Sequence, residues 1–149
     1  MRMCHVAVLL TVLAILLGAR LWAGGGVGED AVSKEIKLFH GSWKAVALQR
    51  SDGSKASDEQ VQNTRLVVEG NKFTLTTANY KITGTFTVDP TKTPKTIDVT
   101  LGDGQGAKLL GIYEQRGDTR KSYFALPEKE RPRQFGAESG YIGFEWKRN

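Results

Sequence analysis

Few side chains in this sequence have types that could carry out chemistry. After residue 23 it contains one histidine, His40, and no cysteine, which excludes a zinc site built from histidine and cysteine ligands. Ser42 follows closely, but nearby residues on a strand point in opposite or divergent directions, so the two do not predict a nucleophile and its base. We interpret His40 as a residue at a helix end or on the surface.

Three further patterns resemble functional motifs. Gly102–Gly106 resembles a phosphate loop but lacks the strand-to-helix setting and the Lys-Ser/Thr ending, so we interpret it as a loop at a barrel mouth. Arg116–Asp118 matches an integrin-binding tripeptide, although a hairpin turn accounts for Gly and Asp there. No spacing of the acidic residues places two on one inward face, as a glycosidase pair requires; these residues are Glu128, Glu130, Glu138 and Glu145. We therefore predict no catalytic residue, no metal and no cofactor.

The charge balance does not indicate a polyanionic partner. Without the first 23 residues, which contain Arg2 and Arg20, 19 basic and 16 acidic residues remain, a net charge of +3. The signs alternate along most of the chain, and the basic residues of 129–133 and 147–148 are interpreted as solvated loop or strand-end residues. An OB-type barrel would need five strands and a focused basic face. We expect no nucleic-acid partner.

Residues 1–23 have the pattern of a signal peptide. Arg2 precedes an apolar run from Val6 to Ala19, which is shorter than the roughly 20 residues that span a membrane. Ala23 offers a cleavage point, but Leu21 lies where a small residue is preferred, so an uncleaved membrane anchor is the alternative. We predict export to the periplasm, the cell surface or the medium.

The next segment is predicted to be a tether and a short helix, which we assign to residues 24–37. Gly24–Gly28 is glycine-rich and predicts a flexible tether. Asp30 can cap a helix that reaches Phe39, because Val32, Ile36 and Phe39 fall on one face. Such a helix would cover one end of the domain formed by residues 38–149.

The remainder of the chain is predicted to be short strands. The clearest alternation runs from Tyr80 to Val88, where every second residue faces one way. A second short helix is predicted to begin at Ser57, with Gln60 completing a capping box. The predicted strands are Trp43–Arg50, Arg65–Glu69, Lys72–Thr77, Tyr80–Val88, Thr96–Leu101, Lys108–Gln115, Arg120–Leu126 and Tyr141–Arg148. Eight such strands predict an all-β, antiparallel, up-and-down barrel.

Several stretches resemble a lipocalin-like domain of unknown function that is greatly expanded in planctomycete bacteria. They are Gly41–Lys44, Arg65–Val68, Gly70–Phe73, Thr85–Lys92, Pro94–Asp98, Leu110–Glu114, Gly117–Thr119 and Lys129–Pro132. The resemblance implies an exported lipocalin-like barrel and brings no established activity or binding residues. The family usually has apolar residues where this chain has Arg120 and Ser122, so either the interior is partly polar or that strand is shifted.

The wider lipocalin resemblance implies a structural role for Trp43. In that superfamily the tryptophan of the first strand packs across the closed end of the barrel against a basic residue of the last strand. Here the partner would be Arg148 or Lys147. A cation over an indole ring contributes about 0.5–2 kcal/mol.

Two functions follow from this fold. The first is non-enzymatic binding of a small, largely apolar ligand; the predicted interior residues are Phe73, Leu75, Tyr80, Ile82, Phe86, Ile97, Val99 and Phe124. The alternative is a barrel that its own large side chains fill, acting as a structural or protein-interaction domain in the cell envelope. Its partner would then be another envelope protein, bound through the loops at 102–106 and 127–140.

Overall fold

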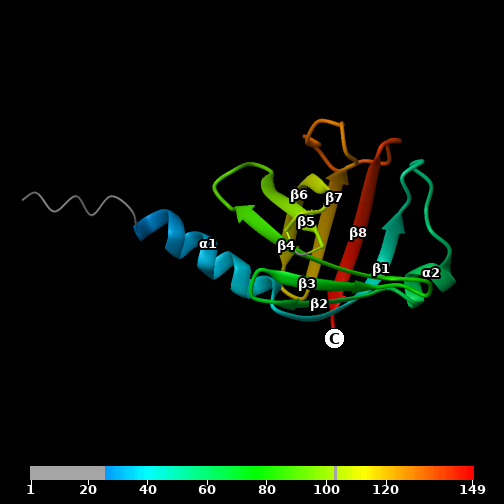
Figure 1. Cartoon of the computed structure of the whole chain (residues 1–149), viewed down its shortest axis with the longest axis horizontal. Helices are drawn as coiled ribbons and strands as arrows, with labels where there is room; N and C mark the ends of the chain where they lie inside the picture. The colour runs from blue at the N-terminus through cyan, green and yellow to red at the C-terminus, as the bar shows by residue number, and fades with distance from the viewer. Residues whose placement is uncertain (1–25, 103) are drawn as a thin grey trace, which may run out of the picture.

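The eight strands form one closed antiparallel barrel, which the computed structural model describes for residues 26–102 and 104–149 (Figure 1). Each strand pairs with its neighbours in sequence, and β8 pairs with β1 to close the barrel. The strands are β1 (Gly41–Gln49), β2 (Arg65–Glu69), β3 (Lys72–Thr76), β4 (Lys81–Asp89), β5 (Lys95–Leu101), β6 (Lys108–Arg116), β7 (Thr119–Ala125) and β8 (Tyr141–Arg148). The predicted eight-stranded antiparallel barrel is confirmed, while the predicted signal segment at residues 1–23 lies outside the described residues.

The predicted short helix between the first two strands is confirmed with its cap. This helix, α2 (Asp58–Gln62), has Ser57 as its N-cap. The Ser57 hydroxyl accepts a hydrogen bond from the Gln60 backbone N–H, and the Gln60 side chain accepts one from the Ser57 N–H. Both interactions satisfy backbone donors that a helix N-terminus leaves free.

Tight turns set the register at one end of the barrel. Gly70 has φ +59° between β2 and β3, and Gly117 has φ +57° between β6 and β7; glycine adopts this left-handed conformation without steric cost. In an up-and-down barrel, alternate connections lie at the same end. The turns after β2, β4 and β6 therefore share the closed end with the start of β1, and the connections after β1, β3, β5 and β7 lie at the open end.

Helix α1 (Gly26–Phe39) ends at the closed end, and Figure 1 shows it leading away from the barrel. Val32 and Ile36 pack against the core and Phe39 is buried, so the predicted apolar face is confirmed. The helix begins at Gly26 rather than at Asp30, so residues 26–28 of the predicted tether are helical. No proline stops the helix there, and an apolar pattern marks the buried face of a helix more firmly than its ends.

A buried carboxylate fastens α1 to the barrel. Glu35 is 8% exposed, its Oε1 accepts a 2.9 Å hydrogen bond from the Tyr113 hydroxyl, and it lies 2.7 Å from Lys95 Nζ. Burial and the bond to Glu35 raise the pKa of Tyr113, so the hydroxyl stays protonated and donates. The sequence pattern did not identify this contact, because the three residues are far apart in the chain.

The Glu35→Ala substitution should lower the free energy of unfolding by about 1–3 kcal/mol, because it leaves the buried Tyr113 hydroxyl without its acceptor. Urea denaturation measures the change. Lys34→Ala, an exposed neighbour on the same helix, is the control and should have little effect. Equal losses in the two variants would contradict this role for Glu35.

Candidate functional site

The barrel encloses a cavity of about 330 Å³. Its lining comes mostly from strands β2 to β8, because every second side chain of these strands faces inward. The end of α1 and the connections after β5 and β7 supply the rest. The lining residues are Phe39, Leu66, Val68, Phe73, Leu75, Ile82, Phe86, Ile97, Val99, Leu101, Ala107, Leu109, Arg120, Ser122, Phe124, Leu126, Pro127, Ile142, Phe144 and Trp146. Only Arg120 and Ser122 among them are polar or charged residue types, so the cavity is largely apolar.

Seven of the eight predicted interior residues line this cavity: Phe73, Leu75, Ile82, Phe86, Ile97, Val99 and Phe124. The prediction for Tyr80 is wrong, because this residue is 58% exposed and does not line the cavity. The β3–β4 ladder ends at the pair Thr76 and Lys81. Tyr80 therefore lies in the turn, where its N–H donates to the Thr77 hydroxyl at 3.2 Å. Alternation in sequence does not reveal where a ladder stops.

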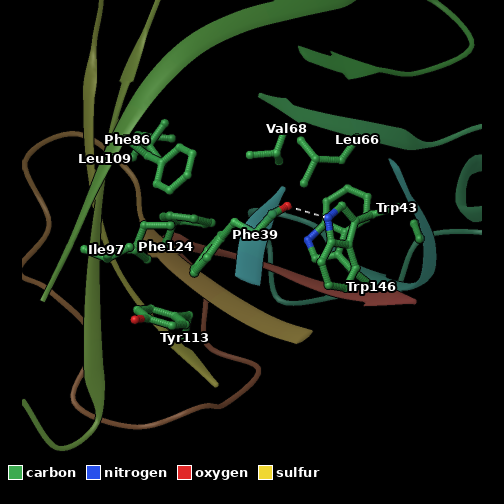
Figure 2. Close-up of a cluster of buried hydrophobic side chains, with 13 residues drawn as sticks. Phe39, Trp43, Leu66, Val68, Phe86, Ile97, Leu109, Tyr113, Phe124 and Trp146 are labelled. Atoms are coloured by element: carbon green, nitrogen blue, oxygen red, sulfur yellow. Dashed lines mark hydrogen bonds between the residues drawn. The ribbon is translucent and has the colours of Figure 1, made fainter. Parts of the chain in front are cut away.

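Other lining residues were not in the predicted set although they follow the same alternation. Leu66 and Val68 come from β2, and Ile142, Phe144 and Trp146 come from β8. The period-two pattern of these strands could have identified them. Phe39, in contrast, enters the barrel from a helix: its ring centre lies 5.1 Å from that of Phe86 and 5.0 Å from that of Tyr113 (Figure 2). That position depends on how the helix docks.

Two inward glycines give room to two of the lining aromatic rings. Gly84 is the cross-strand partner of Phe73, and a Cβ on Gly84 would lie 2.6 Å from that ring. Gly111 is the partner of Phe124, and a Cβ there would lie 2.5 Å from the Phe124 ring. Because a glycine has no side chain, each ring can lie over the neighbouring strand. Both rings therefore take up less of the barrel interior.

The structure decides the orientation of the two polar residues of β7. Arg120 is 4% exposed and Ser122 is 6% exposed, and both line the cavity with Phe124. The β7–β8 register is continuous, with Arg120 opposite Trp146. Of the two interpretations of the sequence, the partly polar interior is therefore correct and the shifted strand is wrong.

Trp43 forms the centre of the barrel floor, which we define as Phe39, Trp43, Gln115, Asp118 and Arg148. Trp43 is fully buried, and its Nε1 donates a 2.8 Å hydrogen bond to the Phe39 carbonyl (Figure 2). The guanidinium of Arg148 lies 4.2 Å from the centre of the Trp43 ring, so the predicted contact is present. Arg120 lies over the same ring at 4.4 Å and over the Phe39 ring at 4.3 Å.

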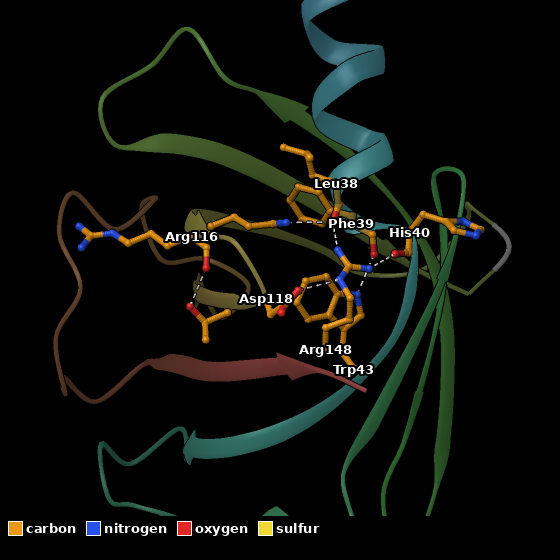
Figure 3. Close-up of polar contacts among 9 residues, drawn as sticks. Leu38, Phe39, His40, Trp43, Arg116, Asp118 and Arg148 are labelled. Atoms are coloured by element: carbon orange, nitrogen blue, oxygen red, sulfur yellow. Dashed lines mark hydrogen bonds and ion pairs between the residues drawn. The ribbon is translucent and has the colours of Figure 1, made fainter.

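The floor also satisfies carbonyls at the end of α1 and directly after it, which have no partners within the helix. Arg148 donates to the carbonyls of Leu38 and His40, and Gln115 donates to that of Leu38 (Figure 3). His40 itself is exposed and directly follows α1, as interpreted from the sequence. The turn that holds Asp118 belongs to the same floor, because the Asp118 carbonyl accepts a 2.8 Å bond from the Arg148 N–H.

Arg120 carries a buried positive charge. Burial and the charge of Arg148 lower the pKa of Arg120 to about 9; at pH 7 the guanidinium is still protonated. Its Nη1 is buried and has no hydrogen-bond partner in the described part of the chain. None of the ion pairs found among the described residues includes Arg120. The cavity therefore contains one unneutralised cation close to its floor.

The mouth of the cavity lies at the open end, where exposed residues join the lining. Ala107 and Pro127 are exposed and lie beside Leu101 and Leu126. Leu101 and Ala107 flank the loop at 102–106. The described residues of this loop, 102 and 104–106, therefore lie at the mouth, as predicted from the sequence. The β7–β8 connection follows Leu126. A ligand would enter between these two connections.

The described residues hold no cluster of metal ligands and no inward pair of carboxylates. No group of three or more His, Cys, Asp or Glu side chains could hold a metal ion within 26–102 and 104–149. Glu128, Glu130 and Glu138 are exposed in the β7–β8 connection, and Glu145 lies 3.4 Å from Lys121 on the outer face. The cavity therefore offers apolar surface, one cation and the Ser122 hydroxyl.

Comparisons with known proteins gave no match to a protein-family model, to a curated protein or to a solved structure. In the part of the chain that is described, no helix is long and apolar enough to cross a membrane.

The Trp43→Ala substitution should lower the free energy of unfolding by about 3–5 kcal/mol, because it removes a fully buried ring and opens a cavity in the floor. Thermal and chemical denaturation measure the loss. Val46→Ala, an exposed position on the same strand, is the control. A Trp43→Ala protein with unchanged stability but lost ligand uptake would assign this residue to binding instead.

Proposed function

We propose that this protein is an exported, lipocalin-like barrel that binds a small, largely apolar ligand in its cavity without catalysing a reaction. The cavity itself carries the proposal. Its volume of about 330 Å³ lies at the lower end of the range of about 300–1,000 Å³ for small-molecule sites. Its lining is apolar apart from Arg120 and Ser122, and burial of apolar ligand surface would supply the binding free energy.

The mouth and the floor support the same proposal. Apolar residues of the mouth, Leu101, Ala107, Leu126 and Pro127, continue into the lining, so an apolar ligand meets apolar surface along the whole path. The opposite end is closed by Phe39 and Trp43, both buried. The site is therefore closed at the floor and opens among the connections of the open end.

The alternative function, a filled barrel that acts as a structural or protein-interaction domain, is less well supported. Large side chains do face inward, but Gly84 and Gly111 allow Phe73 and Phe124 to lie against the wall. Interiors without a ligand site are packed with few voids larger than a water molecule. A cavity of about 330 Å³ is far larger than such a void, so we prefer the binding function.

The purified protein should take up N-phenylnaphthylamine, a neutral fluorescent probe, with a rise in probe fluorescence that saturates. Ile82→Trp should weaken this uptake at least about tenfold, because the larger ring occupies a position that lines the cavity. Thr83→Trp, the exposed neighbour on the same strand, is the matched control and should bind as the unchanged protein does. Absence of saturable uptake, or equal effects of the two variants, would contradict the binding function.

Export is tested separately by the mass of the protein purified from its native host. We expect a mature chain that begins after Ala23 and that is recovered outside the cytoplasm, because the apolar run has the length of a signal peptide. A full-length mass in the membrane fraction would favour the uncleaved anchor. A full-length protein in the cytoplasm would contradict export.

A further inference from the structure

Arg120 is unusual because a buried charge without a partner is costly. The side chain is 4% exposed, and transfer of an ion from water into a protein interior is unfavourable unless the ion is paired and hydrogen-bonded. No acidic side chain pairs with it in the described residues, and the charge nearby, on Arg148, has the same sign. The fold therefore maintains a cation in the cavity that nothing in the described protein neutralises.

The aromatic contacts of Arg120 stabilise its charge only in part. The Phe39 and Trp43 rings lie within 4.4 Å of the guanidinium, and such contacts favour a cation. Aromatic rings lack the oxygen acceptors of a carboxylate, and Nη1 of Arg120 has no hydrogen-bond acceptor. A guanidinium has five N–H donors. The missing interaction at Arg120 is therefore an oxygen acceptor with negative charge.

The position of Arg120 in the cavity determines how a ligand would lie. Arg120 is the second residue of β7, directly after the turn at the closed end, and it contacts the floor. Ser122 is the next inward residue of the strand, and its hydroxyl can donate a second hydrogen bond. All other lining residues are apolar and extend from there to the mouth. A cavity with one polar end and an apolar path to the mouth is suited to an amphiphile.

We infer that the cavity selects single-chain amphiphiles with a carboxylate head group, bound with the head at Arg120 and Ser122 and the apolar tail toward the mouth. A carboxylate matches a guanidinium because two parallel N–H···O bonds can form. This inference rests on the proposed binding function and adds the class of ligand and its orientation to it.

The experiment is displacement of N-phenylnaphthylamine from the purified protein by decanoate, decanol and decylamine, three amphiphiles with the same chain length. We expect decanoate to bind at least about tenfold more tightly than decanol, which corresponds to about 1.4 kcal/mol. Decylamine should bind most weakly, because its positive charge meets that of Arg120. The three dissociation constants give the head-group preference directly.

Two substitutions assign the preference to Arg120. Arg120→Met should abolish it, so that decanoate and decanol bind with affinities within about twofold of each other. Ser122→Asp should have the same effect by a different route, because an internal carboxylate would pair with Arg120 and compete with that of the ligand. Lys121→Met removes a positive charge from the outer face of the same strand and should leave the preference intact.

The outcomes separate this inference from the proposed function. Binding of decanol and decanoate with equal affinity would overturn the inference and leave the binding function standing. Failure of every amphiphile and of the probe to bind would overturn both. If Arg120→Met does not fold, as judged by near-ultraviolet circular dichroism, Ser122→Asp decides. A preference for decanoate that persists in a folded variant of either kind would assign Arg120 a structural role only.

Discussion

Burial of Trp43 joins the end of α1 to the first and last strands of the barrel. Its ring contacts the guanidinium of Arg148 from the last strand, and its N–H bonds the carbonyl of Phe39 at the end of α1. Arg148 then donates to the carbonyl of Leu38 in that helix and to that of His40 directly after it (Figure 3). The same few groups thus supply hydrogen-bond donors to the helix end and join the first strand of the barrel to the last. Because a buried carbonyl without a donor is costly, helix docking and strand pairing support one another.

Closing one end in this way permits the other end to stay hollow. Core packing around Phe39 and Trp43 supplies apolar burial at the floor, so the upper interior need not be filled to stabilise the chain. Gly84 and Gly111 serve the same purpose by accepting the rings of neighbouring strands. The cavity is therefore a consequence of where the large side chains lie, and its volume reflects the cross-strand pairing of aromatic residues with glycines.

The buried charge of Arg120, in contrast, lowers the stability of the fold. Arg120 is held between floor and cavity by two aromatic rings, yet it retains a donor without an acceptor. Folded proteins tolerate few such groups, and those that persist often mark sites where a ligand completes the interaction. Glu35 shows the contrasting case, because its buried carboxylate has two partners, Lys95 and Tyr113, through which it docks the helix.

The strand order, the inward parity of most positions and the capping box of α2 could be predicted from the sequence, because these depend on neighbours in the chain. Parity in β3 to β5 placed Phe73, Ile97 and Val99 correctly. It failed for Tyr80, since hydrogen bonds decide where a ladder ends, and it left Arg120 undecided. Only the tertiary structure revealed that α1 inserts Phe39 into the barrel and that the interior is hollow. Both results depend on how side chains from residues far apart in sequence pack against one another.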